Sequence, residues 1–96
     1  MRFSWDPAKE RRNLAKHGWG FSIAGKLFED PFGTIEPDRF VDGEERWHLF
    51  ASMHHGTTFH LFVVVFCYPD PEDETYVRII SLRPATHRER RTLGGN

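Results

Sequence analysis

Apolar and polar residues alternate along much of this chain, and such alternation predicts β-strands. The predicted strands cover residues 2–5, 33–37, 45–53, 58–68 and 76–82. The fourth of them is rich in Phe and Val, so we expect it at the centre of a sheet, covered on both faces. The polar segments between strands predict loops, and these loops cover residues 38–44, 54–57 and 69–74.

Two helices are predicted between the first and second strands. Asp6 precedes Pro7, which is typical of a helix start, because Asp caps free N–H groups and Pro fits the first turn. Gly18 supplies the left-handed residue that ends this helix. The second helix is expected to begin at Phe21, with Ser22 as its N-cap.

A third, short helix is predicted where Thr86 and Glu89 match a capping box. This order of elements favours an α+β fold. Two N-terminal helices are expected to pack on one face of a mainly antiparallel sheet of four or five strands, followed by the short C-terminal helix. The length of 96 residues predicts a single domain, residues 1–96.

Charge is segregated along the chain. Residues 1–20 carry five Lys/Arg against two acids, residues 21–76 carry three against eleven, and residues 77–96 carry five against one. If the two basic ends meet in the fold, they form one basic face, which is the usual footprint of phosphate binding. The acidic middle then indicates a basic protein partner, and the alternative is a small domain with scattered charge.

Several kinds of chemistry are disfavoured by the composition. Cys67 is a single cysteine in an apolar run, so we expect a buried apolar residue. His54, His55 and His60 do not have the spacing of a structural zinc site, so no metal or other cofactor is expected. The first residues carry no apolar signal sequence, and no apolar run is long enough to cross a membrane. We therefore expect a cytoplasmic protein that makes no membrane contact.

A series of short motifs resembles one known family over nearly the whole chain. The first part consists of Phe3, Trp5, Asp6, Lys9, Asn13 and Lys16-His17-Gly18. The next part consists of Phe21, Ala24, Phe28 and Asp30-Pro31. The last part consists of Glu44-Glu45-Arg46, Arg78-Ile79-Ile80-Ser81, Arg83, Ala85 and Glu89-Arg90. Together these motifs resemble the BrnT-type toxins, and their joint occurrence is more specific than any single motif.

That resemblance implies the toxin of a type II toxin–antitoxin pair, with a fold similar to the RelE-type ribonucleases. Such a toxin cleaves RNA without a metal ion and arrests translation and growth. The implied partner is a cognate antitoxin, a small DNA-binding protein similar to BrnA, which neutralises the toxin. Operator DNA would be reached only through the antitoxin, in a dimer of toxin–antitoxin heterodimers.

Two departures from the family pattern bear on activity. Many relatives carry a tyrosine after the terminal Glu-Arg-Arg, where this sequence has Leu93 and then Gly-Gly-Asn. Pro84 replaces a residue that is often basic or small, and it stiffens the joint between the last strand and the last helix. The tyrosine difference favours an alternative function, a catalytically degenerate, non-enzymatic module that binds protein or nucleic acid.

RNA cleavage without a metal uses the 2′-hydroxyl as nucleophile. The enzyme must then remove its proton, protonate the leaving 5′-oxygen and surround the phosphorane with cations. The catalytic candidates are Arg46, Arg78, Arg83, His17 and His48. His17 lies at a helix C-terminus, where protonation is favoured. Strict alternation places Arg78 and Arg83 on opposite faces of their strand, so the two share a site only if the strand bends near Ser81.

Other polar residues of the two basic ends are candidates for binding the RNA backbone. They are Lys16, Ser81, His87, Arg88, Arg90 and Arg91. The arginines of the last helix are expected to position the RNA through its phosphates. Each candidate also has a structural interpretation, as a helix cap, a surface charge or, for Ser81, a hydroxyl bonded to the backbone.

Overall fold

The computed structural model of the chain describes residues 1–94. In chain order the elements are β1 Arg2–Trp5, α1 Pro7–His17, the 3-10 helix η1 Phe21–Ile23, α2 Ala24–Phe28, β2 Thr34–Val41, β3 Glu44–His55, β4 Thr58–Cys67, β5 Tyr76–Pro84 and α3 His87–Gly94. The predicted order of one strand, two helical segments, three or four strands and a final helix is confirmed, with four strands after the helical segments.

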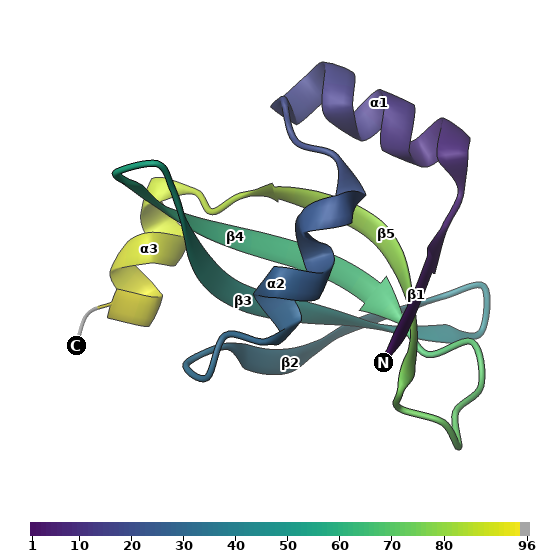
Figure 1. Ribbon diagram of the computed structural model, residues 1–96. Coiled ribbons are helices and arrows are strands. Elements are labelled where there is room, and N and C mark those ends of the chain that lie inside the picture. The colour runs from purple at the N-terminus through teal and green to yellow at the C-terminus, as the bar shows by residue number, and fades with distance from the viewer. Residues whose placement is uncertain (95–96) are drawn as a thin grey trace.

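The five strands form one sheet in the order β1-β5-β4-β3-β2 (Figure 1). Each of the strands β2 to β5 pairs antiparallel with the next one along the chain, whereas β1 pairs with β5 in parallel. The chain therefore returns its last strand to lie beside its first, and the two basic ends of the sequence meet. The α+β class is confirmed, with a mixed five-stranded sheet in which β4 is central, as expected.

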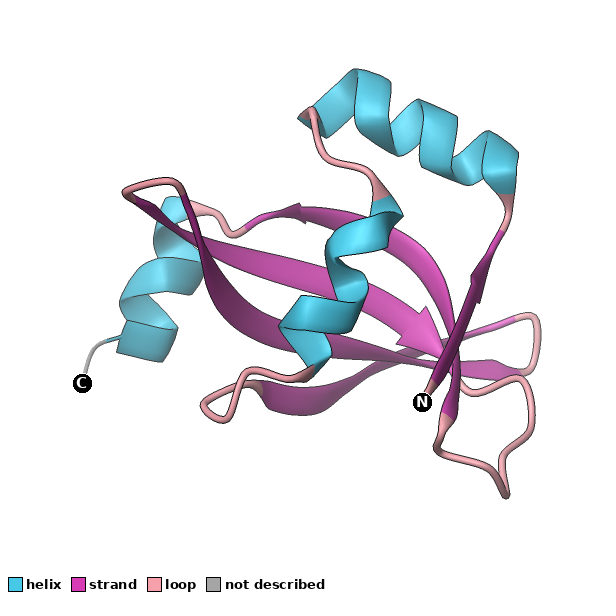
Figure 2. Ribbon diagram, viewed as in Figure 1, coloured by secondary structure: helices cyan, strands magenta, loops and turns pink. Residues whose placement is uncertain are grey.

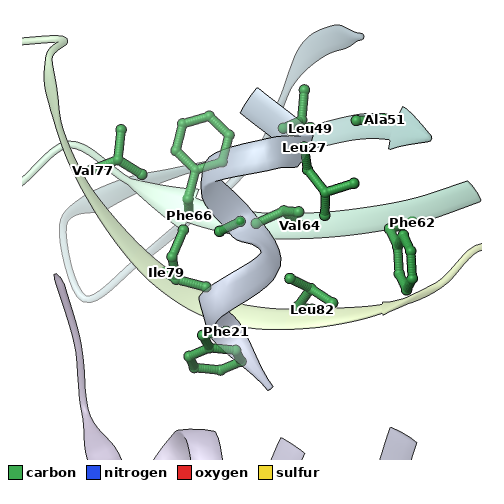
Figure 3. Close-up of a cluster of buried hydrophobic side chains, with 11 residues drawn as sticks. Phe21, Leu27, Leu49, Ala51, Phe62, Val64, Phe66, Val77, Ile79 and Leu82 are labelled. Carbon is green, nitrogen blue, oxygen red and sulfur yellow. The ribbon is translucent and has the colours of Figure 1, made fainter. Parts of the chain in front are cut away.

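One face of the sheet is covered by η1 and α2, which run across it (Figure 2). We call it the covered face. The helical segment contributes Phe21, Ala24 and Leu27, whose spacing of three residues puts them on one side. They pack against buried sheet residues (Figure 3), which are Leu49, Ala51, Phe62, Val64, Phe66, Val77, Ile79 and Leu82. Each large side chain buried here contributes about 1.5–3 kcal/mol, enough to hold a helical segment that would not form alone.

Helix α1 does not lie on the covered face, so the prediction that both N-terminal helices pack on one face is wrong for α1. It lies along the edge of β5, beyond the end of β1. The buried Asn13 explains this position, because its Nδ2 donates to the carbonyl of Leu82 at 2.6 Å and its Oδ1 accepts from the Leu82 N–H at 3.1 Å. Nδ2 also donates to the carbonyl of Trp19 at 2.9 Å. One side chain thus satisfies the backbone that a further strand would otherwise pair.

Three predictions from local sequence signals are confirmed. The Asp6 carboxylate accepts a backbone N–H of the first turn of α1 at 2.9 Å. Gly18 ends that helix with a left-handed backbone, φ 78°. At the start of α3, the Thr86 N–H donates to Glu89 at 2.8 Å, and the Glu89 N–H donates to the Thr86 hydroxyl at 3.1 Å.

Two other local predictions are wrong, and a third is right only in part. Ser22 is not an N-cap, because the chain enters η1 from an extended Gly20 without any capping side chain. Residues 38–44 are not a loop, since β2 and β3 occupy most of them and the turn is confined to Asp42 and Gly43, with φ 52° and 77°. The turn predicted at 54–57 is likewise shorter, because β3 continues to His55. Tight two-residue turns demand positive φ, which Gly and Asp tolerate.

Candidate RNA-binding and catalytic face

A bulge in β5 decides where the arginines of this strand point. Val65 of β4 pairs with Ser81, whereas the next residue, Phe66, pairs with Ile79, so Ile80 is an extra residue in β5. A bulge of this kind reverses the alternation of side chains that follows it. Arg78 before the bulge and Arg83 after it therefore point to the same face. The condition that the sequence set for a shared site is met.

That face lies opposite the covered face, and we call it the open face. Arg46, His48 and Phe50 project there from β3, and their partners across the sheet follow from the strand register. The rows across the open face are Arg46–Cys67–Arg78, then His48–Val65–Ser81, then Phe50–Val63–Arg83. Three of the five catalytic candidates are thus arginines that flank a row containing a fourth, His48.

Val65 forms the floor of this arrangement. Among the open-face residues of β4 it is half-buried, whereas its neighbours Val63 and Cys67 are fully buried at 0% exposure. Residues two strands apart lie about 10 Å from each other, so His48 and Ser81 stand on either side of Val65. Val65 is therefore partly accessible to solvent, and it lies between the row of Arg46 and Arg78 and the row of Arg83.

The first of these arginine rows surrounds a buried thiol. Burial, and after it a hydrogen bond with Glu44 and the charge of Glu44, raise the pKa of Cys67, whereas the charges of Arg78 and Arg46 lower it, and the net result is a pKa of about 11. These three charged residues therefore gather over Cys67, which is a buried apolar residue as predicted. The Nε–H of Arg46 is buried and has no hydrogen-bond partner within residues 1–94. Such an unpaired donor is costly, and it is typical of a group that meets an anion in function.

Arg83 is held by an ion pair with α3. Its two terminal nitrogens donate to the two carboxylate oxygens of Glu89 at 2.8 and 3.0 Å. Hydrogen bonds from Arg83 lower the pKa of Glu89 to about 2, and the same bonds raise the pKa of Arg83. One terminal nitrogen also donates to the Pro84 carbonyl at 3.4 Å. A guanidinium has five N–H donors, so two remain for another ligand. The capping box was the sequence signal for this contact, since Glu89 accepts hydrogen bonds both from the Thr86 N–H and from Arg83.

His48 is oriented by a carboxylate from β2. Its Nε2 lies 3.3 Å from Oδ2 of Asp38, and both side chains are about one quarter exposed. The ring also makes an edge contact with Phe50, with the two ring centroids 5.8 Å apart. An imidazole fixed in this way keeps its Nδ1 available for proton transfer. Asp38 was missed by the sequence analysis because it lies in a segment that was predicted as a loop.

The C-terminal half of α1 brings a second histidine to β5. Lys16, His17, Ile80 and Ser81 line a shallow hollow of about 320 Å³ together with Lys9, Arg12 and Asn13. Burial lowers the pKa of His17 below its usual 6.5, and the charges of Lys16 and Arg83 lower it further. The expectation that the helix C-terminus favours protonation is wrong here, because burial and two cations outweigh the helix dipole.

The α3 candidates lie further from the centre. His87, Arg88 and Arg91 are exposed on α3, away from the row of His48 and Ser81. Arg90 lines a different cavity at the end of the open face. Leu93 and the residues after it occupy the segment in which many relatives carry a tyrosine. The side chain of Leu93 lies outside the described part of the chain.

Tyr76 is a polar residue of the open face that the sequence analysis did not single out. It precedes Arg78 on the same face of β5, and its hydroxyl lies 3.0 Å from the hydroxyl of Ser4 on β1. The guanidinium of Arg2 stacks 4.3 Å from the Tyr76 ring centre. The hydrogen bond with Ser4 and the charges of Arg78 and Arg2 lower the pKa of Tyr76. The sequence did offer a signal for Tyr76, because it lies two residues before Arg78 in a predicted strand and so shares its face.

Neither metal-ligand clusters nor membrane helices are found in the part of the chain that the structure describes. No group of three or more His, Cys, Asp or Glu side chains in residues 1–94 is placed to hold a metal ion. His55 and His60 instead pack on Trp19, with ring centroids 5.5 and 5.0 Å from it. No helix among these residues is long and apolar enough to cross a membrane.

Residues 5–89 match the family described as "Ribonuclease toxin, BrnT, of type II toxin-antitoxin system". The match covers most of the chain, from the last residue of β1 through the open-face arginines to the capping box of α3. The chain belongs to the BrnT family. A comparison with curated proteins gives no match. Membership makes this chain a ribonuclease toxin of a type II toxin–antitoxin system, and a cognate antitoxin is its partner.

Proposed function

We propose that this BrnT chain is a metal-independent endoribonuclease that cleaves RNA on the open face of its sheet. The observation that supports this most is the β5 bulge, because it brings Arg78 and Arg83 to the face that carries Arg46 and His48. Fixed guanidinium groups on strands are suited to a phosphorane, whose charge grows in the transition state. The scissile phosphate lies above Val65 in this proposal.

Two histidines supply the proton transfers. His17 stays neutral near neutral pH because its pKa is lowered, so it accepts the proton of the 2′-hydroxyl. The 2′-oxygen then bonds to phosphorus, the bond from phosphorus to the 5′-oxygen breaks, and His48 donates a proton to that oxygen. Asp38 orients His48 for this step. The products are a 2′,3′-cyclic phosphate and a 5′-hydroxyl.

The remaining candidates bind the RNA backbone. Lys16 and Ser81 lie in the hollow beside His17, where they contact the strand that enters the site. His87, Arg88, Arg90 and Arg91 extend the cationic surface along α3. Contacts of this kind add affinity without sequence preference, and they weaken as salt is raised.

The decisive experiment is cleavage of a structured RNA by the purified chain in EDTA. We expect discrete fragments whose 5′-hydroxyl ends accept a phosphate from polynucleotide kinase. Arg78→Ala and Arg46→Ala should each lower the rate about 100-fold or more, which is typical of losing one group that stabilises the transition state. Arg11→Ala is the matched control, because Arg11 is exposed on α1 and does not line the hollow.

A second candidate function is the non-enzymatic binding module. The closed ion pair of Arg83 with Glu89 favours it, because this arginine is already engaged. A folded chain that binds RNA but yields no fragments would support the module and contradict the nuclease. Fragments that persist in EDTA but are unchanged by Arg46→Ala and Arg78→Ala would place catalysis elsewhere on the chain.

The antitoxin completes the proposal. We infer that it is a small BrnA-like protein that binds DNA, and that a dimer of toxin–antitoxin heterodimers binds the operator through it. We expect this chain to act in the cytoplasm. Its induction should arrest growth of the cells, and co-expression of the antitoxin should relieve the arrest. The likeness to RelE-type ribonucleases belongs to the same proposal, since the mixed sheet and its cationic face are what such a fold requires.

A further inference from the structure

A second hollow lies at the end of the open face, next to α3. Its volume is about 430 Å³, which is within the range of small-ligand sites. We call it the aromatic pocket, and its lining consists of Asp30, Phe32, Thr34, Phe50, Ala51, Ser52, Phe59, Leu61 and Arg90. Phe32 and Phe59 are 88% and 56% exposed, which is unusual for side chains of this size.

The aromatic pocket also has a fixed polar group. One carboxylate oxygen of Asp30 accepts the N–H of Ser52 at 2.8 Å and its hydroxyl at 3.2 Å, and the other accepts the N–H of Phe32 at 2.9 Å. Burial raises the pKa of Asp30, but these hydrogen bonds outweigh burial and lower it. A carboxylate accepts about four hydrogen bonds, so one position is free for a ligand that donates.

The aromatic pocket is continuous with the proposed cleavage site. Phe50 follows His48 on the same face of β3 and shares its row with Arg83. Alternate residues of a strand are about 7 Å apart, a distance that one nucleotide spans. A strand whose phosphate lies above Val65 would therefore carry its next base towards Phe50.

The charge at the rim favours nucleic acid over an apolar peptide as the occupant. Arg90 lines the aromatic pocket, and Arg88 and Arg91 are exposed on the same short helix without lining it. Cations beside aromatic rings are the usual combination for single strands, where the bases stack and the phosphates are neutralised. An apolar segment of a protein would gain nothing from the charge of Arg90.

We propose that the aromatic pocket binds an unpaired nucleobase next to the scissile phosphate, stacked on Phe50 and Phe59, with an N–H of the base donated to Asp30. This inference rests on the proposed function, because the open face must first bind RNA. It assigns selection of the cleaved position to the aromatic pocket and the chemistry to the arginines and histidines.

The test is binding of a short single strand that is 2′-deoxy throughout, so that it cannot be cleaved by this mechanism. A fluorescent base, 2-aminopurine, is moved along the strand, and its fluorescence falls where it stacks. We expect strong quenching at one position with wild type, and about 10-fold or more weaker binding with Phe50→Leu or Phe59→Leu, as expected for a lost stacked base. Leucine keeps the site apolar, and circular dichroism checks the fold.

Phe40→Leu is the control, since Phe40 is 69% exposed on β2 and does not line the aromatic pocket. Equal quenching in wild type and Phe50→Leu would overturn the inference, and so would equal losses in Phe40→Leu and Phe50→Leu. Weaker binding of the antitoxin to Phe50→Leu, with binding of the strand unchanged, would assign the pocket to the partner instead. Quenching at one position without any cleavage of RNA would overturn the proposed function and leave the base pocket standing.

Discussion

Strands β3, β4 and β5 contribute residues to both the covered and the open face of the sheet, yet the residues of the two faces serve different purposes. On the covered face, side chains such as Leu49, Phe62 and Val64 are at most 3% exposed and pack under η1 and α2. On the open face, β3 contributes Arg46 and His48 and β5 contributes Arg78 and Arg83, and the Arg46 Nε–H has no partner in the described chain. Neighbouring residues can therefore differ completely in what they contribute.

The difference indicates that the covered face supplies stability that the open face does not need to supply. A face that gathers like charges and leaves a buried donor unpaired destabilises the fold. The core on the other side of the strands offsets that cost. Substitutions on the two faces should therefore separate stability from RNA cleavage, and the following changes test that separation from the largest expected effect to the smallest.

The sharpest comparison uses two adjacent valines of β4. Val64 is fully buried on the covered face, and Val65 is half-buried on the open face. We expect Val64→Ala to lower the free energy of unfolding by about 2–3 kcal/mol, because it removes packed methyl groups and leaves a cavity. Val65→Ala should cost less than about 1 kcal/mol. Urea denaturation measures both, and equal losses would show that the two faces do not differ as described.

The contrast between the faces was only partly predictable from the sequence. Alternation in β3 correctly separated Arg46 and His48 from Leu49, and the Phe/Val-rich segment correctly predicted the central strand. The β5 bulge could not be predicted, since Ile80 fits a regular strand as well as a bulge. Its position is set by pairing with β4, which is a long-range interaction.

The place of α1 was missed for a similar reason. The caps of this helix are local, and both were predicted correctly from Asp6 and Gly18. Its docking depends on Asn13 reaching Leu82, which is 69 residues away in sequence. The open-face partners Asp38 and Tyr76 were missed because strand pairing, not local pattern, brings them to the site.

Asn13 joins the edge of the sheet to the site, so its loss should affect both properties. Asn13→Ala leaves the N–H and carbonyl of Leu82 and the carbonyl of Trp19 without this partner. We expect a loss of about 2 kcal/mol in the free energy of unfolding, because unpaired backbone groups at a buried position are costly. RNA cleavage should fall as well, since α1 carries Lys16 and His17.

Asn13→Asp provides the control for that change. Aspartate keeps the acceptor for the Leu82 N–H but replaces the donor with a charged oxygen that faces two carbonyls. Unfolding in urea should show Asp to be at least as destabilising as Ala. A neutral result for both variants would mean that α1 is held by other contacts.

The ion pair between Arg83 and Glu89 gives a pH-dependent difference at the end of the open face. The pKa of Glu89 falls from 4.5 to about 2 in the folded chain, so this carboxylate stabilises the fold above pH 4.5. That contribution is lost as pH falls towards 2. Since both side chains are 23–30% exposed, we expect about 1–2 kcal/mol.

Glu89→Gln should remove this part of the acid destabilisation, as seen in urea denaturation at pH 5 and at pH 2.5. Glu72→Gln is the matched control, because Glu72 is exposed in the acidic loop and forms no salt bridge with any described residue. If the two variants lose stability equally between these pH values, the ion pair does not stabilise α3.

The smallest effect concerns His17, at the boundary between α1 and the open face. Its pKa is lowered by burial first and then by Lys16 and Arg83, so we expect an NMR titration midpoint below 6.5. Because the unfolded chain binds this proton more readily, stability falls as pH drops below 6.5. Lys16→Ala removes one of the cations and should move the midpoint back up, whereas Lys26→Ala on α2 should leave it unchanged. A midpoint at 6.5 would mean that burial and the two cations do not act on His17, and a midpoint well above neutral pH would mean that it is charged there and cannot accept the proton of the 2′-hydroxyl.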